Sequence, residues 1–195
     1  IPVDQSMGGG SGTRASVPRR VRVAHPYMTD AGIKAIPANH SDLDQWRKNF
    51  VGVSYLHPAT NFEVFGAIDD LWLTEGGEYL VVDYKATAKK DEVNLDADWQ
   101  ISYKRQMEIY QWLLRKNGLP ISNRGWFVYC NGKRDLDRFN NKVEFKVSLL
   151  PYDGNDDWVE TALIEAKETL NRSELPPADA SCDFCSYRQE TAVFE

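Results

Sequence analysis

Two apolar runs joined by a glycine pair constrain the fold of this chain more than any other feature. The first run covers residues 61–73 and alternates between apolar and polar positions, which predicts a strand. The second covers residues 79–87. Because only a short turn around Gly76 and Gly77 separates them, we expect an antiparallel hairpin.

Three charged side chains interrupt these strands. Asp83 and Lys85 are two positions apart, so they point to the same face of the sheet with Cα atoms about 6.5–7 Å apart. Asp69 is predicted to lie in the middle of the first strand, and it joins them if the hairpin register allows it. Asp70 faces the other way and is expected to be structural. The apolar residues 80–82 indicate a central strand, where charged groups need partners.

Two carboxylates beside one ammonium suit a hard divalent cation such as Mg²⁺, which prefers oxygen ligands. Such an ion polarises a phosphodiester oxygen and lowers the pKa of bound water. The lysine can orient that water or balance developing negative charge. The three residue types therefore favour metal-dependent phosphodiester hydrolysis. The alternative is a solvated ladder of cross-strand ion pairs, which are common and weakly stabilising.

The remaining pattern alternates helices with strands. We expect a helix that is capped by Ser41 and ends at Phe50, a helix over residues 99–114 that stops at residues 117–120, strands at 125–130 and 143–150, and a helix over 156–171. Together with the hairpin, these elements predict an α/β fold, a mixed central β-sheet flanked by helices. We interpret residues 1–13 as a tag or linker remnant and residues 14–195 as a single domain.

Composition excludes several classes of protein. No apolar run approaches the roughly 20 residues that a membrane-spanning helix needs, so no membrane association is expected. Three cysteines, an odd number, favour a reducing compartment over a disulfide scaffold, and a cytoplasmic protein is expected. The net charge of −6 argues against unspecific coating of nucleic acid but allows a local basic groove.

Three short motifs occur in order along the chain: Gly66-Ala67-Ile68-Asp69, then Asp83-Tyr84-Lys85, then Gln106 to Tyr110 with three residues between. This ordered set resembles the PD-(D/E)XK nuclease superfamily, specifically the RecB-like branch that includes the CRISPR-adaptation exonucleases. The resemblance covers residues 62–187. It implies a restriction-endonuclease-like core and a Mg²⁺- or Mn²⁺-dependent DNA nuclease, an exonuclease acting on DNA ends or single strands, as in DNA repair.

The resemblance also implies roles for single residues. Asp69 and Asp83 correspond to metal ligands, with the backbone carbonyl of Tyr84 as a third. Lys85 corresponds to the catalytic lysine.

Two further residues follow on the helix. Gln106 and Tyr110 lie one helical turn apart, so both can contact a metal-bound water or the DNA backbone. Tyr110 also belongs to the apolar stripe of its helix, and a role confined to the core stays open.

Basic residues flank the predicted site at Lys89, Lys90, Lys104 and Arg105. They could hold a phosphate backbone without reading sequence, or they could belong to an ordinary solvated face. The expected partners are DNA and a helicase-like, CRISPR or repair protein.

Cysteine usage departs from the family. Relatives hold an iron–sulfur cluster with four cysteines, and Cys182 and Cys185 resemble the start of the C-terminal part of that motif. No cysteine follows them, and Cys130 lies in a buried-strand pattern that favours a core thiol. Because a cluster or zinc site needs about four ligands, we do not expect this chain to hold a cluster.

A second departure concerns the N-terminal part. The branch usually supplies a His or Glu metal ligand from a helix before the hairpin, and His25, His40 and His57 do not lie on a convincing helix. We expect that the chain lacks its natural N-terminus. The alternative to an enzyme is a non-catalytic module that keeps the nuclease fold and binds nucleic acid or a partner. Retention of Asp69, Asp83 and Lys85 favours the enzyme.

Overall fold

The computed structural model describes residues 23–134, 138 and 141–192, so the predicted tag or linker remnant lies outside the described residues. The strands are β1 (Ala35–Pro37), β2 (Val53–His57), β3 (Phe62–Gly66), β4 (Asp70–Thr74), β5 (Tyr79–Thr87), β6 (Arg124–Gly132) and β7 (Phe145–Asp153). The helices are α1 (Pro26–Asp30), α2 (Leu43–Trp46), α3 (Ile101–Lys116), α4 (Trp158–Leu170) and α5 (Asp183–Thr191), with a 3₁₀ turn (Asp98–Gln100) before α3.

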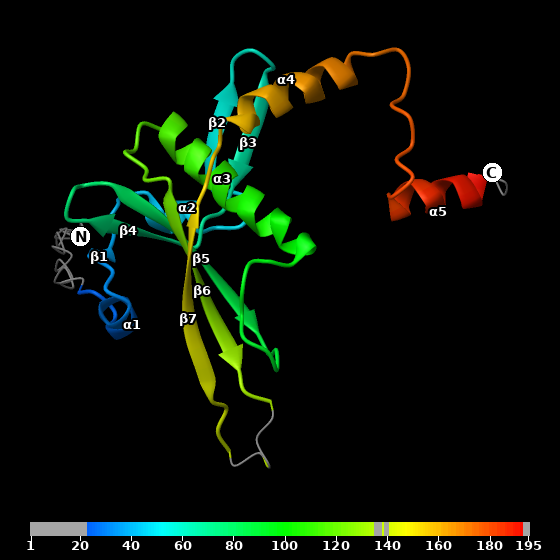
Figure 1. Cartoon of the computed structure of the whole chain (residues 1–195). Coiled ribbons are helices and arrows are strands. Elements are labelled where there is room, and N and C mark those ends of the chain that lie inside the picture. Colours follow the sequence, from blue (N-terminus) through cyan, green and yellow to red (C-terminus); the bar gives the residue numbers. More distant parts are fainter. Residues whose placement is uncertain (1–22, 135–137, 139–140, 193–195) are drawn as a thin grey trace, which may run out of the picture.

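A mixed five-stranded sheet in the order β1-β4-β5-β6-β7 forms the centre of the protein (Figure 1). β5 and β6 are parallel, with α3 between them in the chain, while all other neighbours in this sheet are antiparallel. β2 and β3 form a separate two-stranded sheet that contacts α3. The predicted class, a mixed sheet flanked by helices, is confirmed.

The two faces of the central sheet are buried against different helices. Leu71 and Val81 pack on one face with Leu113 of α3. Trp72 on the neighbouring position of β4 packs on the other face with Met28 of α1. Because side chains alternate along a strand, each residue of β4 and β5 belongs to the α3 face or to the α1 face.

Several predicted elements are confirmed. The hairpin is β4 and β5, joined by the turn that contains Gly77 at φ 85°. The clearest predicted helix is α3, which ends at the C-cap Asn117 and is followed by Gly118 at φ 83°. The apolar run 125–130 lies in β6, between β5 and β7.

The helix predicted from Ser41 to Phe50 was too long. α2 has only four residues, and its N-cap is Asp42, whose side chain makes no capping hydrogen bond. The chain turns instead at Phe50, which has φ 68°, before β2 begins.

The strand predicted over residues 61–73 is two strands in different sheets, β3 and β4. The chain crosses between the sheets at residues 67–69, so Asp69 does not lie in the middle of a strand. The crossing is close to α3, since a Cβ on Gly66 would lie 2.7 Å from Cε1 of Tyr110. Close packing at a glycine, which alternation alone does not reveal, therefore divides the run.

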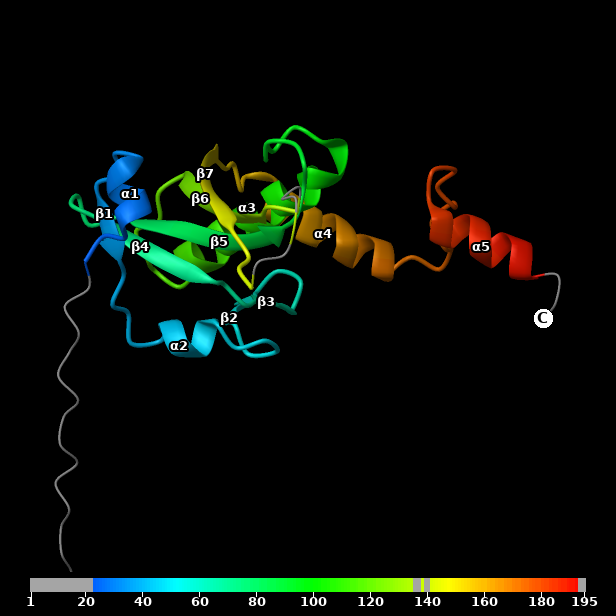
Figure 2. The ribbon, with the colours of Figure 1, turned by 90° about the horizontal axis from the view of Figure 1, so that it is seen from below.

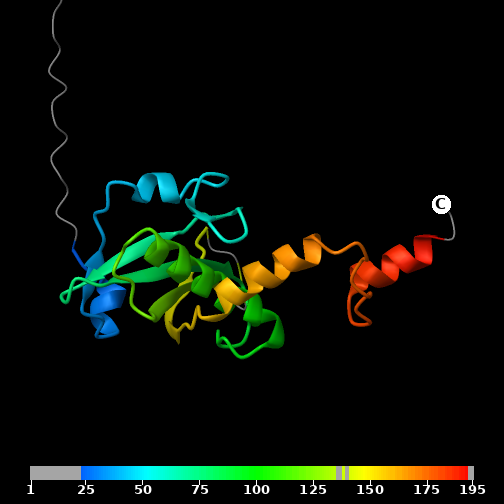
Figure 3. The ribbon, with the colours of Figure 1, turned by 90° about the horizontal axis from the view of Figure 1, so that it is seen from above.

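The C-terminal region extends away from the sheet (Figures 2 and 3). α4 buries Val159, but Leu170 at its end is exposed, so the predicted apolar stripe is buried only near its start. The sequence did not predict α1, β1, β2 or α5. Within the described ranges, no helix has the length and apolar character needed to cross a membrane.

Candidate active site

Asp83 and Lys85 lie on β5 in step with Val81, so they belong to the α3 face of the sheet. Asp83 is buried and Lys85 is half-buried. Nζ of Lys85 lies 2.7 Å from Oδ2 of Asp83 and donates a hydrogen bond of 3.1 Å to Oε1 of Gln106 on α3. The lysine therefore joins the central strand to the helix.

Asp69 reaches this group from the segment just before β4. The hairpin register pairs Asp70 with Val82, which places Asp69 opposite Asp83 on the next position. Oδ2 of Asp69 accepts a hydrogen bond of 2.7 Å from the backbone N–H of Tyr84. The first strand was predicted too long. The hairpin register nevertheless allows Asp69 to join Asp83 and Lys85, and the three charged residues converge.

Gln106 and Tyr110 complete the group from α3. Nε2 of Gln106 donates to the Tyr110 hydroxyl at 2.9 Å. The Tyr110 ring is buried in the core beneath the sheet. Burial raises the pKa of Tyr110, which favours its neutral phenol. The two interpretations of this residue are thus compatible, since its ring is core and its hydroxyl belongs to the polar group.

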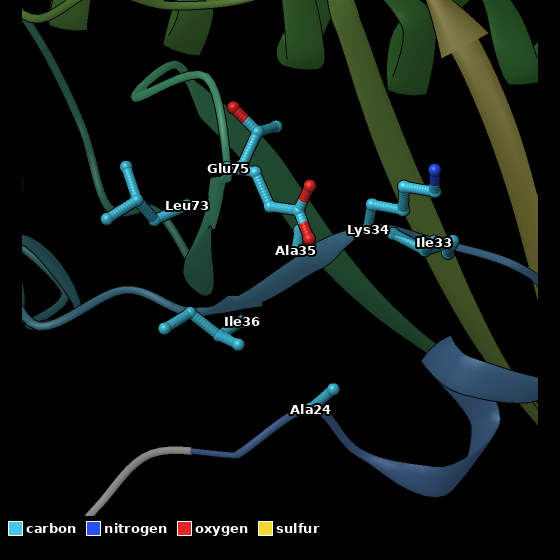
Figure 4. Close-up of a pocket in the computed structure, with 8 residues that line it drawn as sticks. Ala24, Ile33, Lys34, Ala35, Ile36, Leu73 and Glu75 are labelled. Atoms are coloured by element: carbon cyan, nitrogen blue, oxygen red, sulfur yellow. The ribbon is translucent and has the colours of Figure 1, made fainter.

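These side chains line one open cleft of about 540 Å³. Its lining residues are Asn49, Phe50, Phe65, Ala67, Asp69, Asp83, Tyr84, Lys85, Gln106 and Tyr110. A second cavity of about 330 Å³ lies at the β1 edge, between Ile36, Leu73 and the opposed charges of Lys34 and Glu75 (Figure 4). None of the predicted site residues lines that cavity.

The charge of the cleft fits a divalent cation. Burial raises the pKa of Asp83, the Lys85 ammonium lowers it, and the charge of Asp69 raises it. Oδ2 of Asp83 is buried, and the Lys85 ammonium, 2.7 Å away, is the partner that the described residues give it. A buried carboxylate oxygen in that state, with a second carboxylate in the same cleft, is a suitable donor set for Mg²⁺ or Mn²⁺. Among the described residues no group of three or more His, Cys, Asp or Glu side chains is arranged to hold a metal ion.

Two residues that the sequence did not single out position this group. Arg47 donates through Nε to the Asp69 carbonyl at 2.8 Å and through Nη2 to Oδ1 of Asp70. The Tyr103 ring lies 4.2 Å from Nζ of Lys85. Tyr103 could have been found from its position one turn before Gln106, whereas no local pattern indicates Arg47, which lies 22 residues before Asp69.

The four predicted phosphate-binding residues do not line the cleft. Lys89 and Lys90 line a small separate pocket, and the Lys89 ammonium lies 4.8 Å from the Trp99 ring. Lys104 lies 6.0 Å from the ring centroid of Tyr152. Arg105 lies over the ring of Trp158, with 5.3 Å between its guanidinium carbon and the ring centroid.

The histidines also lie away from the cleft. His57 is buried, with Nδ1 2.8 Å from Oγ1 of Thr60 and Nε2 2.8 Å from Oε2 of Glu160. His25 stacks on Tyr27, and His40 stacks on Trp46.

The cysteine pair lies at the start of α5. Cys182 is its N-cap, and its Sγ accepts a hydrogen bond from the Cys185 backbone N–H at 3.4 Å, which lowers the pKa of the Cys182 thiol. Cys130 lies on β6 and is half-buried, so it is not the fully buried core thiol that the strand pattern predicted.

The mixed sheet and the acids and lysine at its centre define a restriction-endonuclease-like fold. The model of the PD-(D/E)XK nuclease superfamily matches residues 14–189, and the chain belongs to this superfamily. Its members usually hydrolyse phosphodiester bonds with divalent metal ions. No curated protein matches the chain significantly.

Proposed function

We propose that this protein is a Mg²⁺- or Mn²⁺-dependent deoxyribonuclease of the RecB-like branch, an exonuclease that acts on DNA ends or single strands. The observation that carries the proposal is the convergence of Asp69, Asp83 and Lys85 on one cleft, from the segment just before β4 and from β5. A cytoplasmic, nucleoid-associated location and a role in DNA repair, with a helicase-like or CRISPR partner, belong to the same proposal.

Asp69, Asp83 and the backbone carbonyl of Tyr84 would hold the metal. The ion, when bound, would polarise the scissile phosphodiester and lower the pKa of the attacking water. The protein's own contribution begins with Lys85, whose ammonium can donate to that water or to a phosphate oxygen. Its hydrogen bond to Gln106 keeps it directed at the cleft, and Tyr110 in turn fixes the Gln106 amide.

Phosphate binding outside the cleft is proposed for the four basic residues of the flanks. Their positions allow contact with a strand that extends beyond the cleft, because three of them are exposed and Lys104 is half-buried. The residues are Lys89, Lys90, Lys104 and Arg105.

A specific observation supports the second candidate, a non-catalytic nucleic-acid-binding module. Only two carboxylates line the cleft, and the described residues supply no third His, Cys, Asp or Glu to a metal group. Two carboxylates suffice for Mg²⁺ when waters and substrate phosphate complete its shell, which favours the enzyme.

Digestion of labelled single- and double-stranded DNA with Mn²⁺, compared with Lys85→Ala, tests the proposal. We expect wild-type protein to degrade at least one substrate and Lys85→Ala, assayed below its melting temperature, to lose this activity. Addition of EDTA should stop the wild-type reaction. If wild-type and Lys85→Ala proteins bind DNA equally and neither degrades it, the binding module is correct and the nuclease proposal fails.

A further inference from the structure

We propose that Phe50 and Phe65 form a stacking site for unpaired nucleobases at the mouth of the cleft, and that they select single-stranded over duplex nucleic acid. The proposal rests on the nuclease function above and names its substrate class. Neither residue belongs to a motif that the sequence singled out.

Both rings are exposed to solvent beside the charged residues of the cleft. Phe50 is 94% exposed and Phe65 is 55% exposed, yet both line the cleft that contains Asp69 and Lys85. Removing apolar ring surface from water is favourable, so an occupant that covers both rings would gain binding affinity. Two exposed aromatic rings that line the same cleft as a phosphodiester site suit the faces of nucleobases.

The backbone holds the turn that carries Phe50 next to the strand that carries Phe65. Phe50 has φ 68°, a left-handed conformation that bulky residues seldom adopt and that surrounding structure must impose. Gly52, two residues later, is packed so tightly against β3 that a Cβ would overlap the Gly66 backbone oxygen. Ser54 is then paired with Phe65 in the β2–β3 register. The turn that carries Phe50 is therefore attached to the strand that carries Phe65.

Charge within the cleft cannot supply the affinity for a polyanion. Among the described residues that line the cleft, Lys85 is the one cation. It is paired with Asp83, and Asp69 adds a further negative charge. Strand affinity next to the scissile bond must then come from the divalent ion and from stacking. In a duplex the base faces are already stacked and paired, whereas an unpaired base can present its face to a phenyl ring.

The test compares Phe50→Ala/Phe65→Ala with Leu56→Ala. Leu56 is a matched control because it is exposed on β2, pairs with Glu63 of β3 and does not line the cleft. Binding is measured by fluorescence anisotropy in the Lys85→Ala background, with labelled oligothymidylate, an abasic strand of equal length and a DNA duplex. Hydrolysis of the oligothymidylate is measured with Mn²⁺ in the wild-type background.

The double variant should bind oligothymidylate about 10- to 100-fold more weakly, a loss of about 1.4–2.8 kcal/mol of binding free energy, because bases can no longer stack on the two rings. The abasic strand should lose much less affinity, and kcat/KM for oligothymidylate should fall in step with binding. Leu56→Ala should match the parent protein in each assay.

Equal losses for the abasic strand and oligothymidylate would overturn the stacking site, and so would unchanged oligothymidylate binding in the double variant. Absence of hydrolysis by wild-type protein contradicts the nuclease function instead, and the anisotropy measurements then still decide whether the rings hold bases.

Discussion

The two faces of the β4–β5 hairpin carry acids with opposite surroundings. On the α1 face, Asp70 accepts hydrogen bonds from Arg47, from the Leu71 N–H and from the Tyr84 hydroxyl. On the α3 face, the one partner of the Asp83 carboxylate within the described part of the chain is the Lys85 ammonium, 2.7 Å from Oδ2.

An acid that lines the cleft and an acid that does not are thus neighbours in the chain. Asp69 and Asp70 are adjacent in the chain and belong to opposite faces because a strand alternates its side chains. Asp70 and Asp83 are both buried, so burial does not distinguish these two acids. They differ in how completely the protein pairs their carboxylate oxygens. A carboxylate with its lone pairs satisfied inside the protein stabilises the fold, whereas one with oxygen capacity left over can bind a cation.

The largest expected effect is on hydrolysis. Asp83→Asn should reduce the Mn²⁺-dependent turnover of DNA at least about 1000-fold, since it removes a ligand of an ion that stabilises the transition state by several kcal/mol. Asp70→Asn, assayed below its melting temperature, should remain within about tenfold of wild type. Turnover that is unchanged in Asp83→Asn would remove the enzyme interpretation and leave the binding module.

Metal binding provides the second test of the comparison. An ion that binds only the folded state at 100 times its Kd adds about 2.7 kcal/mol, which corresponds to a rise in Tm of about 5–10 °C for a chain of this size. We expect Mn²⁺ to produce this rise in wild type and in Asp70→Asn but not in Asp83→Asn. Differential scanning fluorimetry across a Mn²⁺ titration measures it, and an equal rise in Asp83→Asn would place the ion elsewhere.

For stability we expect the reverse order, with a larger effect in Asp70→Asn than in Asp83→Asn. Asp70→Asn leaves Arg47 without its buried partner and should lower the free energy of unfolding by about 1–3 kcal/mol. Asp83→Asn should lower it much less or raise it, because a buried charge of raised pKa is itself destabilising. Urea denaturation in EDTA gives both values, and a greater loss in Asp83→Asn would reverse the assignment of the two faces.

The smallest effect concerns pH. The pKa of Asp83 is raised above its ordinary 3.8, so between the two values the folded protein binds more protons than the unfolded chain. The free energy of unfolding contributed by Asp83 therefore falls as pH rises through its folded pKa and is constant above it. In EDTA, wild type should lose stability relative to Asp83→Asn from acid to neutral pH. If wild type instead gains stability relative to Asp83→Asn from acid to neutral pH, the Lys85 ammonium affects the pKa of Asp83 more than burial does.

Much of the fold followed from local pattern. Three local patterns each predicted an element that is present: the α3 periodicity, the Gly-Gly turn and the apolar β6 run. Each pattern can be recognised within one continuous segment of sequence. The same reasoning failed at Phe50 and at residues 67–69, where packing of Gly52 and Gly66 against distant backbone and side chains redirects the chain. The extent of α2 and the division between β3 and β4 depend on such contacts, which no window of sequence contains.

The candidate site divides in the same way. The sequence alone determined that Asp83 and Lys85 share a face and that Gln106 and Tyr110 lie one turn apart, because strand and helix periods are fixed by backbone geometry. Only the tertiary structure decided that Asp69 meets them and that Arg47 holds the Asp69 segment. It also brought two exposed phenyl rings to the cleft. These relations join residues far apart in the chain, and register and packing between elements set them.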